Sequence, residues 1–345
     1  MKKLFTIFLL VTVVFGLSFS PAAAESSTVK TKSKNEMLEL LGFTKEDVKS
    51  LLSNKGEVKL KGENKEKLNL NKKDILHLAN LGFTKERIER FTQRDWDHFK
   101  DKEPADLVDV KVSYSKYNEL TGKMEPATKE EYETAEKNNK EKYKKAKKNK
   151  SPGGEFSAQL CDIDTTCEGS NSSSMVRLVV AATHSTTYAI VSDFDWVYDS
   201  NERHIDLFGS GHKEALTVDY STIFGSWTTE YHDNYGYVAS RTTSTGSYYP
   251  DSNGYYHKLD RDSYSHEEYW QRDGQWLQAV DDSGYTYAEF DWSYGTSSSA
   301  YALYTHMKTG WSTSFGVSLP AGASISVSNT TSDVPISSAA VSFTK

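Results

Sequence analysis

Apolar and polar residues alternate with a period of two through most of the chain after residue 155, which limits what that region can fold into. The stretches MVRLVVAATHSTTYAIVSDFDWVY (175–198) and YAEFDWSY (287–294) are rich in β-branched and aromatic residues, which favour strands. The dipeptides that suit tight turns between strands are Asn253-Gly254, Asp273-Gly274 and Ser283-Gly284. We therefore predict an antiparallel β-sandwich or barrel over residues 156–345.

Two stretches in this region share the pattern acid-Phe-Asp-Trp-x-Tyr, at residues 193–198 and 289–294. In the first, the aromatic residues would point to one face of a strand and Asp193 and Asp195 to the other. We interpret the aromatic face as core and the acidic face as exposed to water. The alternative is that the acids line a groove or hold a cation, although no stretch fits the spacing of a calcium loop.

A tyrosine-rich segment, YYPDSNGYYHKLDRDSYSHEEYW, spans residues 248–270. Directly after it, Asp273-Gly274 predicts a hairpin over residues 267–278. Tyrosine and tryptophan offer flat faces with a polar tip, which suit stacking on sugar rings and contacts with proteins. One interpretation is an exposed sheet face, and the other is a binding face for a glycan or a peptide. The predicted ligand-binding residues are Tyr255, Tyr256, Tyr264, Tyr269, Trp270 and Trp276.

Charge and aromatic content change sharply near residue 150. Residues 25–150 hold 30 Lys and Arg against 24 Asp and Glu, whereas residues 151–345 hold 9 against 24. Of the 21 tyrosines, 17 follow residue 150. Together with the turn-forming run Ser151–Gly154, this change predicts a domain boundary. We therefore predict a multidomain α + β protein with a helical module, a connector and the aromatic, acidic β domain over residues 156–345.

The six-residue sequence LGFTKE occurs twice, at residues 41–46 and 81–86. In each copy a glycine that can end one helix precedes a threonine that can cap the next. Because one helix pair buries little apolar surface, we predict that two pairs pack on each other in a helical module over residues 33–100. The alternative is a DNA-reading helix-turn-helix, but export and the spread of the positive charge argue against it.

Residues 101–155 are predicted to form a charged connector, in which the run KEEYETAEKNNKEKYKKAKKNK (129–150) forms one solvent-exposed helix. Seven lysines fall between Lys140 and Lys150. Cations are favourable near a helix C-terminus, so a solvated helix end is one interpretation. The other is adhesion to polyanions such as teichoic acid or anionic lipid.

The first 24 residues have the order of a secretory signal peptide. Lys2 and Lys3 precede an almost wholly apolar run over residues 4–17, and small residues end at Ala24. We predict cleavage after Ala24 and release of the chain outside a Gram-positive bacterium, with no transmembrane segment in the mature protein. A membrane anchor is the alternative, but the run is shorter than the roughly 20 residues that a span needs.

Cys161 and Cys167 are the two cysteines of the chain. In an oxidising exterior, a pair this close can form a disulfide that closes a small loop, and we predict this bond. Asp162 and Asp164 lie between them, so metal binding is an alternative, but two thiols without a nearby His make a poor zinc site. Two free thiols are the remaining alternative.

Catalytic motifs are poorly matched. The sequence HEEYW at residues 266–270 begins like the zinc-protease motif H-E-x-x-H, but Trp270 stands where the second His is needed. The sequence has no G-x-S-x-G, Walker-type or dinucleotide-binding motif. A pair of carboxylates can hydrolyse glycosides, and the candidates are Glu230, Glu267, Glu268 and Glu289.

These observations favour a secreted, non-enzymatic binding protein of the cell envelope or extracellular matrix. Its predicted ligand is a cell-wall glycan or a surface protein, and no cofactor, metal or nucleic acid is expected. The first alternative is a secreted antibacterial or membrane-active, toxin-like protein, because GWSTSFGVSLPAGASISVSN (310–329) predicts an amphipathic hairpin of a kind that membrane-inserting toxins use. The second alternative is an extracellular glycan hydrolase.

Overall fold

The structure is a computed structural model, and it describes residues 32–148 and 174–345 with short gaps. The residues outside the description are 1–31, 54–55, 59, 61–67, 119–120, 122, 149–173, 198–204, 214, 233–237, 246, 252–253, 261–277, 307–315, 319–323 and 327–335. The chain from Lys32 onward is one compact unit. The expected signal peptide, the cysteine pair and the hairpin at Asp273-Gly274 therefore lie outside the described residues.

Helices are concentrated in the first half of the described chain. They are α1 (Lys34–Leu40), α2 (Lys45–Leu52), α3 (Lys72–Asn80), α4 (Lys85–Glu89), α5 (Gln93–Phe99) and α6 (Lys129–Lys148). The strands are β1 (Asp106–Asn118), β2 (Lys123–Pro126), β3 (Ser174–His184), β4 (Tyr188–Val197), β5 (Ile205–His212), β6 (Leu216–His232), β7 (Val238–Thr245), β8 (Tyr249–Asp251), β9 (Gly254–Asp260), β10 (Gln278–Trp292), β11 (Ser297–His306), β12 (Gly316–Ser318), β13 (Ser324–Ser326) and β14 (Ile336–Thr344). None of the helices in this part of the chain is long and apolar enough to cross a membrane.

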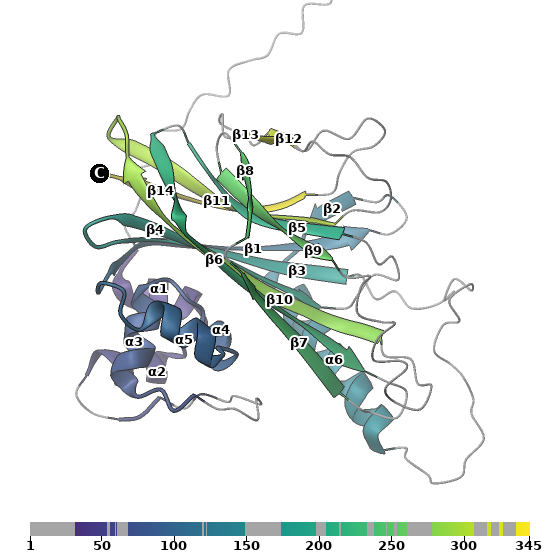
Figure 1. The fold of residues 1–345 in the computed structure, drawn as a ribbon. Helices are drawn as coiled ribbons and strands as arrows, with labels where there is room; N and C mark the ends of the chain where they lie inside the picture. The colour runs from purple at the N-terminus through teal and green to yellow at the C-terminus, as the bar shows by residue number, and fades with distance from the viewer. Residues whose placement is uncertain are drawn as a thin grey trace, which may run out of the picture. The chain divides into compact units, whose positions relative to one another are not determined.

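The strands form two main sheets (Figure 1). One has seven strands in the order β2-β1-β3-β4-β10-β6-β7, and the other has five in the order β14-β11-β5-β9-β8. The described strand pairs are antiparallel, as the alternating pattern predicts. Their facing surfaces share a core in which Phe194 packs on Phe208, with ring centroids 4.5 Å apart, and Trp196 packs on Tyr304 at 5.3 Å. This part of the fold is a β-sandwich.

The seven-stranded sheet is covered on its other face by helices α1 to α5 (Figure 1). Phe83, Phe91 and Phe99 from the helices share one apolar core with Phe224 and Tyr285 from the sheet. The ring centroid of Phe83 lies 5.1 Å from that of Tyr285. The helices therefore share one apolar core with the sheet as well as with each other, whereas the sequence predicted only that the two pairs would pack on each other.

The LGFTKE corners do have the predicted local geometry. Gly42 and Gly82 have φ values of +88° and +97°, a region in which only glycine avoids a steric penalty. Thr44 and Thr84 accept hydrogen bonds from the backbone amides of Asp47 and Arg87, respectively, and so cap α2 and α4. Two contacts through Lys85 join the corners: its backbone amide donates to the carbonyl oxygen of Leu41 at 2.8 Å, and its ammonium group donates to Asp47 at 2.8 Å.

The predicted connector over residues 101–155 is wrong in its first part. Asp106–Asn118 is strand β1, which pairs with β3 from Asp106↔His184 to Tyr117↔Ser174. Strands from both sides of the predicted boundary near residue 150 therefore belong to one sheet. The high charge obscured a strand pattern in which Leu107, Val110 and Tyr117 are buried. The charged helix itself is present as α6.

The prediction of a turn at Ser283-Gly284 is also wrong, since β10 runs through both residues. A side chain at Gly284 would lie 2.5 Å from Phe194 and 2.7 Å from Trp227. Glycine is needed here because neighbouring side chains fill the space over the strand, and not because the chain turns. Strands β8 and β9 do pair on either side of the predicted turn at Asn253-Gly254. The predicted final hairpin is present as β12 and β13, with Val317 opposite Ile325.

Candidate functional site

The acidic face of β4 lies beneath the helices, so the prediction that it is exposed to water is wrong. Asp193 and Asp195 are only 1% and 3% exposed. Arg87 of α4 donates from Nε to Asp193 Oδ2 at 2.8 Å and from its guanidinium to the carbonyl oxygen of Phe194 at 3.2 Å. The aromatic half of the prediction is confirmed, because Phe194 and Trp196 are fully buried in the sandwich.

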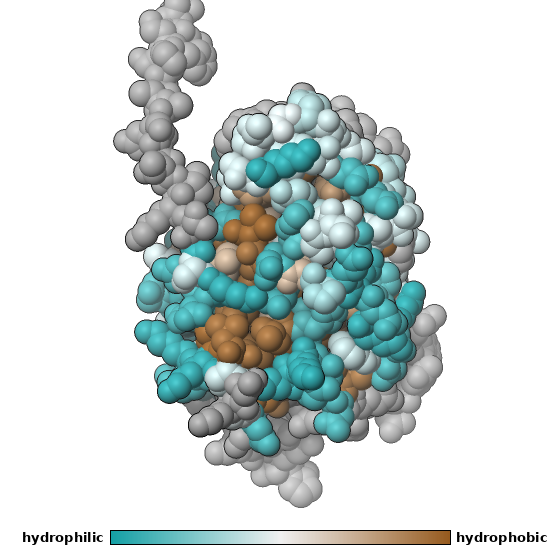
Figure 2. All heavy atoms as spheres, turned by 90° about the vertical axis from the view of Figure 1, so that its left-hand side faces the viewer, coloured by the Kyte–Doolittle hydropathy of each residue, from teal (hydrophilic) through white to brown (hydrophobic). Residues whose placement is uncertain are grey.

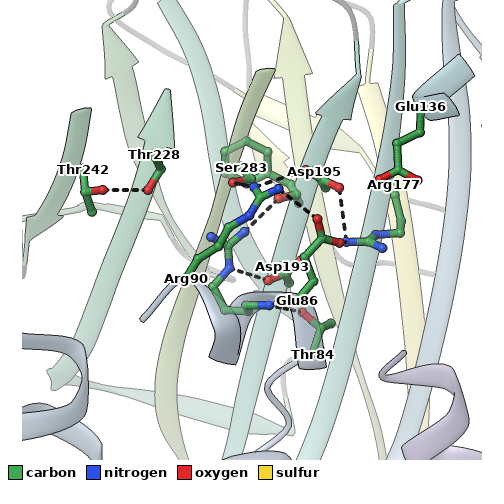
Figure 3. Close-up of polar contacts among 12 residues, drawn as sticks. Thr84, Glu86, Arg90, Glu136, Arg177, Asp193, Asp195, Thr228, Thr242 and Ser283 are labelled. Carbon is green, nitrogen blue, oxygen red and sulfur yellow. Dashed lines mark hydrogen bonds and ion pairs between the residues drawn. The ribbon is translucent and has the colours of Figure 1, made fainter. Parts of the chain in front are cut away.

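Further charges surround Asp195 (Figure 3). Arg177 of β3 lies 2.7 Å from Glu86 and 3.3 Å from Asp195. Arg90, which directly follows α4, lies 3.7 Å from Asp195 and donates to the Ser283 hydroxyl. On the other side, the Tyr132 hydroxyl of α6 donates to Asp195 at 2.7 Å. We call this set the β4 charge cluster; its charged members are Glu86, Arg87, Arg90, Arg177, Asp193 and Asp195.

Within the β4 charge cluster, burial and neighbouring charges shift the pKa values of the acids in opposite directions. Burial disfavours the charged form of Glu86, but the arginines Arg177 and Arg90 outweigh it and hold the pKa of Glu86 well below its usual value. For Asp193, burial outweighs the attraction of Arg87 and Arg177, so its pKa is raised. Burial, together with the negative charge of Asp195, raises the pKa of Tyr132 well above its usual value.

Perturbed pKa values occur both at active sites and in structural ion-pair networks. Three arginines face three carboxylates in the β4 charge cluster, and the acids of β4 are almost inaccessible to solvent. The cluster connects α4 and α6 to β3 and β4 through side chains. We therefore interpret the β4 charge cluster as the contact that docks these helices on the sheet, and not as a place where a substrate reacts.

Two pairs of stacked tyrosines that include solvent-exposed rings lie elsewhere, on and beside strands β6, β8 and β9. The rings of Tyr249 and Tyr256 stack with centroids 5.2 Å apart and an angle of 11° between their planes. Lys258 Nζ lies 4.7 Å from the centroid of the Tyr249 ring. A second pair, Tyr220 and Tyr248, stacks at 5.5 Å and 18°. We call these four tyrosines the tyrosine edge.

The tyrosine edge has the chemistry of a recognition surface. The exposed fractions are 45% for Tyr249 and 37% for Tyr220, so both rings offer area to a ligand. Tyr249 lies on strand β8, which ends the five-stranded sheet, whereas Tyr220 lies on β6 of the seven-stranded sheet. Parallel rings with a nearby ammonium group can stack on a flat ligand and donate hydrogen bonds to it.

The structure places two of the six predicted ligand-binding residues. Tyr256 belongs to the tyrosine edge. Tyr255 is completely buried and accepts a hydrogen bond from the Thr286 hydroxyl at 3.1 Å, and burial raises its pKa to about 12. The prediction that Tyr255 lies on an exposed binding face is therefore wrong, because alternate residues of β9 point to opposite faces. Outside the described residues lie Tyr264, Tyr269, Trp270 and Trp276, together with Cys161 and Cys167.

Of the carboxylates considered for glycoside hydrolysis, the structure describes the side chain of Glu289. It accepts hydrogen bonds from Lys102 at 2.6 Å and from the Tyr287 hydroxyl at 2.9 Å. Within the described residues, no group of three His, Cys, Asp or Glu side chains is placed to hold a metal ion. In the lysine-rich region, Lys140 pairs with Glu136 on the same helix.

Sequence reasoning missed Tyr220 and the arginines of the β4 charge cluster. For Arg87 a signal was present in the repeat. The first LGFTKE copy is followed by Asp47, which completes a capping box with Thr44, whereas the second copy is followed by Arg87. Arg87 cannot complete a capping box as Asp47 does, and its side chain pairs with Asp193 instead.

Comparisons with known proteins add little. No family model and no curated protein matches the chain. Among solved structures, the chain shows a likeness to the crystal structure of the KRT10-binding region domain of the pneumococcal serine-rich repeat protein PsrP. The match has 11% sequence identity, covers 38% of this chain and 76% of that one, and has a TM-score of 0.16. At this score it carries no inference about fold or function.

Proposed function

We propose that this protein is a secreted, non-enzymatic binding protein that recognises a glycan of the cell envelope through the tyrosine edge. The observation that carries the proposal is the exposed, nearly parallel stack of Tyr249 on Tyr256, with Lys258 beside it. Secretion rests on the sequence of residues 1–24.

A glycan suits this surface for chemical reasons. Sugar rings present one relatively apolar face, which packs on aromatic rings, and hydroxyl groups around it, which accept hydrogen bonds from an ammonium group such as Lys258. The ring faces and the ammonium group of the tyrosine edge bind and orient a ligand.

A membrane-active role is the second candidate, and the β12–β13 hairpin favours it. The hairpin lies in the chain between the paired strands β11 and β14, and its ladder belongs to neither of the two main sheets. An amphipathic hairpin between two strands that already pair can move without breaking the sheet on either side of it.

The test uses residues 25–345 with purified Gram-positive cell wall, and measures the protein that sediments at low and at high salt. We expect salt-resistant binding that Tyr249→Ala and Tyr256→Ala each weaken by roughly 2- to 12-fold, because an aromatic stacking contact contributes about 0.5–1.5 kcal/mol. The matched control is Tyr294→Ala, since Tyr294 is 55% exposed and lies outside the tyrosine edge.

Four results would contradict the proposal. Binding that survives both substitutions would exclude the tyrosine edge, and binding lost after protease treatment of the wall would identify a protein ligand. Binding only at low salt would assign adhesion to the lysines between Lys140 and Lys150. Release of dye from liposomes by the same protein would favour the membrane-active role.

A further inference from the structure

A cavity of about 300 Å³ lies on the helical side of the seven-stranded sheet, at the end where β3 turns into β4. Its walls come from the end of α3, the link between α5 and β1, the β3–β4 turn and strand β10. This volume is at the lower end of the range for small-molecule sites. The tyrosine edge contributes no residue to this cavity.

The polar groups of the cavity are organised around Glu289. One carboxylate oxygen accepts from Lys102 and from the Tyr287 hydroxyl, and the other lies 3.5 Å from the Thr187 hydroxyl. Lys102 Nζ also lies 5.3 Å from the centroid of the Tyr287 ring. The side chains of Glu289 and Lys102 are about a quarter exposed, at 22% and 25%. The protein thus fixes the positions of a carboxylate and an ammonium group that a ligand can reach.

Thr183 supplies a second, independent observation. Its side chain lines the cavity and is completely buried, and its hydroxyl has no hydrogen-bond partner among the described residues. A buried hydroxyl without a partner costs about 1–3 kcal/mol of stability. Its neighbours on the helical face of β3, Val179 and Ala181, are apolar, so a valine here would avoid that cost. A ligand in the cavity would give the hydroxyl its missing partner.

The chemistry of the lining selects the class of ligand. Asp101, Glu103 and Glu289 contribute three carboxylates, whereas Lys102 is the only cation among the lining residues. An anionic ligand would be repelled by this excess of negative charge. The hydroxyls of Thr183, Thr186 and Thr187 and the carboxylates together favour a ligand with many hydroxyl groups, and an amine would also be accepted.

We propose that this cavity, which we call the Glu289 pocket, binds a neutral or amine-bearing sugar of monosaccharide size. The site is separate from the tyrosine edge and does not depend on the function proposed for it. A free monosaccharide and the terminal unit of a glycan chain present the same groups to the pocket, so both sources are part of the test.

The experiment titrates residues 25–345 with glucose, glucosamine, N-acetylglucosamine and glucuronate, and measures binding by calorimetry and by saturation-transfer NMR. N-acetylglucosamine disaccharide is titrated in parallel to separate a free sugar from a chain end. The main variant is Thr183→Val, which keeps the side-chain volume and removes the hydroxyl. The matched control is Ser298→Ala, because Ser298 also has a buried hydroxyl without a described partner but lies outside the cavity. A second variant is Glu289→Gln.

We expect at least one of the three neutral or amine-bearing sugars to bind saturably, and glucuronate to bind at least tenfold more weakly. Thr183→Val should weaken binding about fivefold without lowering the thermal midpoint. Glu289→Gln should weaken it further, whereas Ser298→Ala and Tyr249→Ala should leave it unchanged.

The proposal is overturned if none of the three sugars binds at tens of millimolar. It is also overturned if glucuronate binds most tightly, or if Thr183→Val binds as well as the unaltered chain. Loss of sugar binding in Tyr249→Ala would assign the sugar to the tyrosine edge instead. Cell-wall binding that fails while the sugar still binds would contradict only the function proposed for the tyrosine edge.

Discussion

Arg87 Nε and Asp193 Oδ2 lie 2.8 Å apart, and their side chains are only 5% and 2% exposed. The two residues are 106 positions apart in sequence, and they connect a five-residue helix to the centre of the seven-stranded sheet. Because α4 is too short to be stable alone, this contact and the apolar core beneath the helix hold it in place.

Replacement of Arg87 by alanine should lower the free energy of unfolding by about 3–5 kcal/mol, because it leaves Asp193 buried without its partner. Replacement of both residues, as Arg87→Met with Asp193→Asn, should cost less than Arg87→Ala alone. Urea unfolding of the single and double variants measures this difference.

The control for this prediction is an exposed ion pair. Lys100 and Asp97 lie 2.7 Å apart with side chains 40% and 49% exposed, and such exposed pairs contribute little to stability. Lys100→Ala should therefore have little effect. If Arg87→Ala lowered the free energy of unfolding no more than Lys100→Ala does, the buried pair would not be what holds α4 in place.

Glu86 should make the stability depend on pH. Its pKa in the folded chain lies well below the ordinary value of 4.5. The stability that it contributes is therefore fully present above about pH 4.5 and is lost progressively as the pH falls further. Asp193 acts in the opposite direction, because its raised pKa means that protonation relieves the cost of burying its charge.

The variant Glu86→Gln isolates the first contribution. Its loss of stability relative to the unaltered chain should be larger at pH 7 than at pH 3, measured by urea unfolding at each pH. Glu133→Gln is the matched control, since the side chain of Glu133 is 57% exposed on α6, and at pH 7 it should lower the stability less than Glu86→Gln does. A difference for Glu86→Gln that stays constant over this range would contradict the prediction.

Local sequence patterns predicted where the strands and the LGFTKE corners lie. They predicted less well which part of the chain packs on each face of a strand. Alternation identified β3, β4 and the end of β10, and the corners at Gly42 and Gly82 followed from backbone geometry alone. The hidden face of β4 was different. Asp193 and Asp195 have the pattern of a solvated strand face, and contacts with distant residues, among them Arg87 and Arg177, make their burial possible.

The candidate sites also depend on contacts between distant parts of the chain, which local sequence patterns do not predict. The exposure of Tyr256 and the burial of Tyr255 depend on which face of β9 meets the other sheet, and composition does not determine that register. The Glu289 pocket unites residues from four separate segments. Glu289 was considered as a hydrolase carboxylate, but its partner Lys102 is 187 positions away, so no short motif could have indicated the pocket.

The two LGFTKE glycines should respond differently to alanine. Both have positive φ values, so each substitution should cost about 1–2 kcal/mol. A side chain at Gly82 would also lie 2.8 Å from the Ala181 side chain, whereas at Gly42 the nearest atom would be 4.0 Å away. Overpacking adds about 1–3 kcal/mol, so Gly82→Ala should be the more destabilising variant in urea unfolding. Equal losses would show that the corner at Gly82 can move away from β3.

Tyr255 and Tyr256 should separate folding from recognition. Tyr255→Ala empties a fully buried position and should cost about 3–5 kcal/mol, measured by urea unfolding. Tyr256→Ala should cost less than about 1 kcal/mol, because its ring packs on exposed Tyr249, but it should weaken cell-wall binding. Tyr255→Phe is the control that keeps the ring and removes the hydroxyl, and it should fall between the two in stability. If Tyr256→Ala instead unfolded the protein, the stack at β8 would be part of the core and would not be available to a ligand.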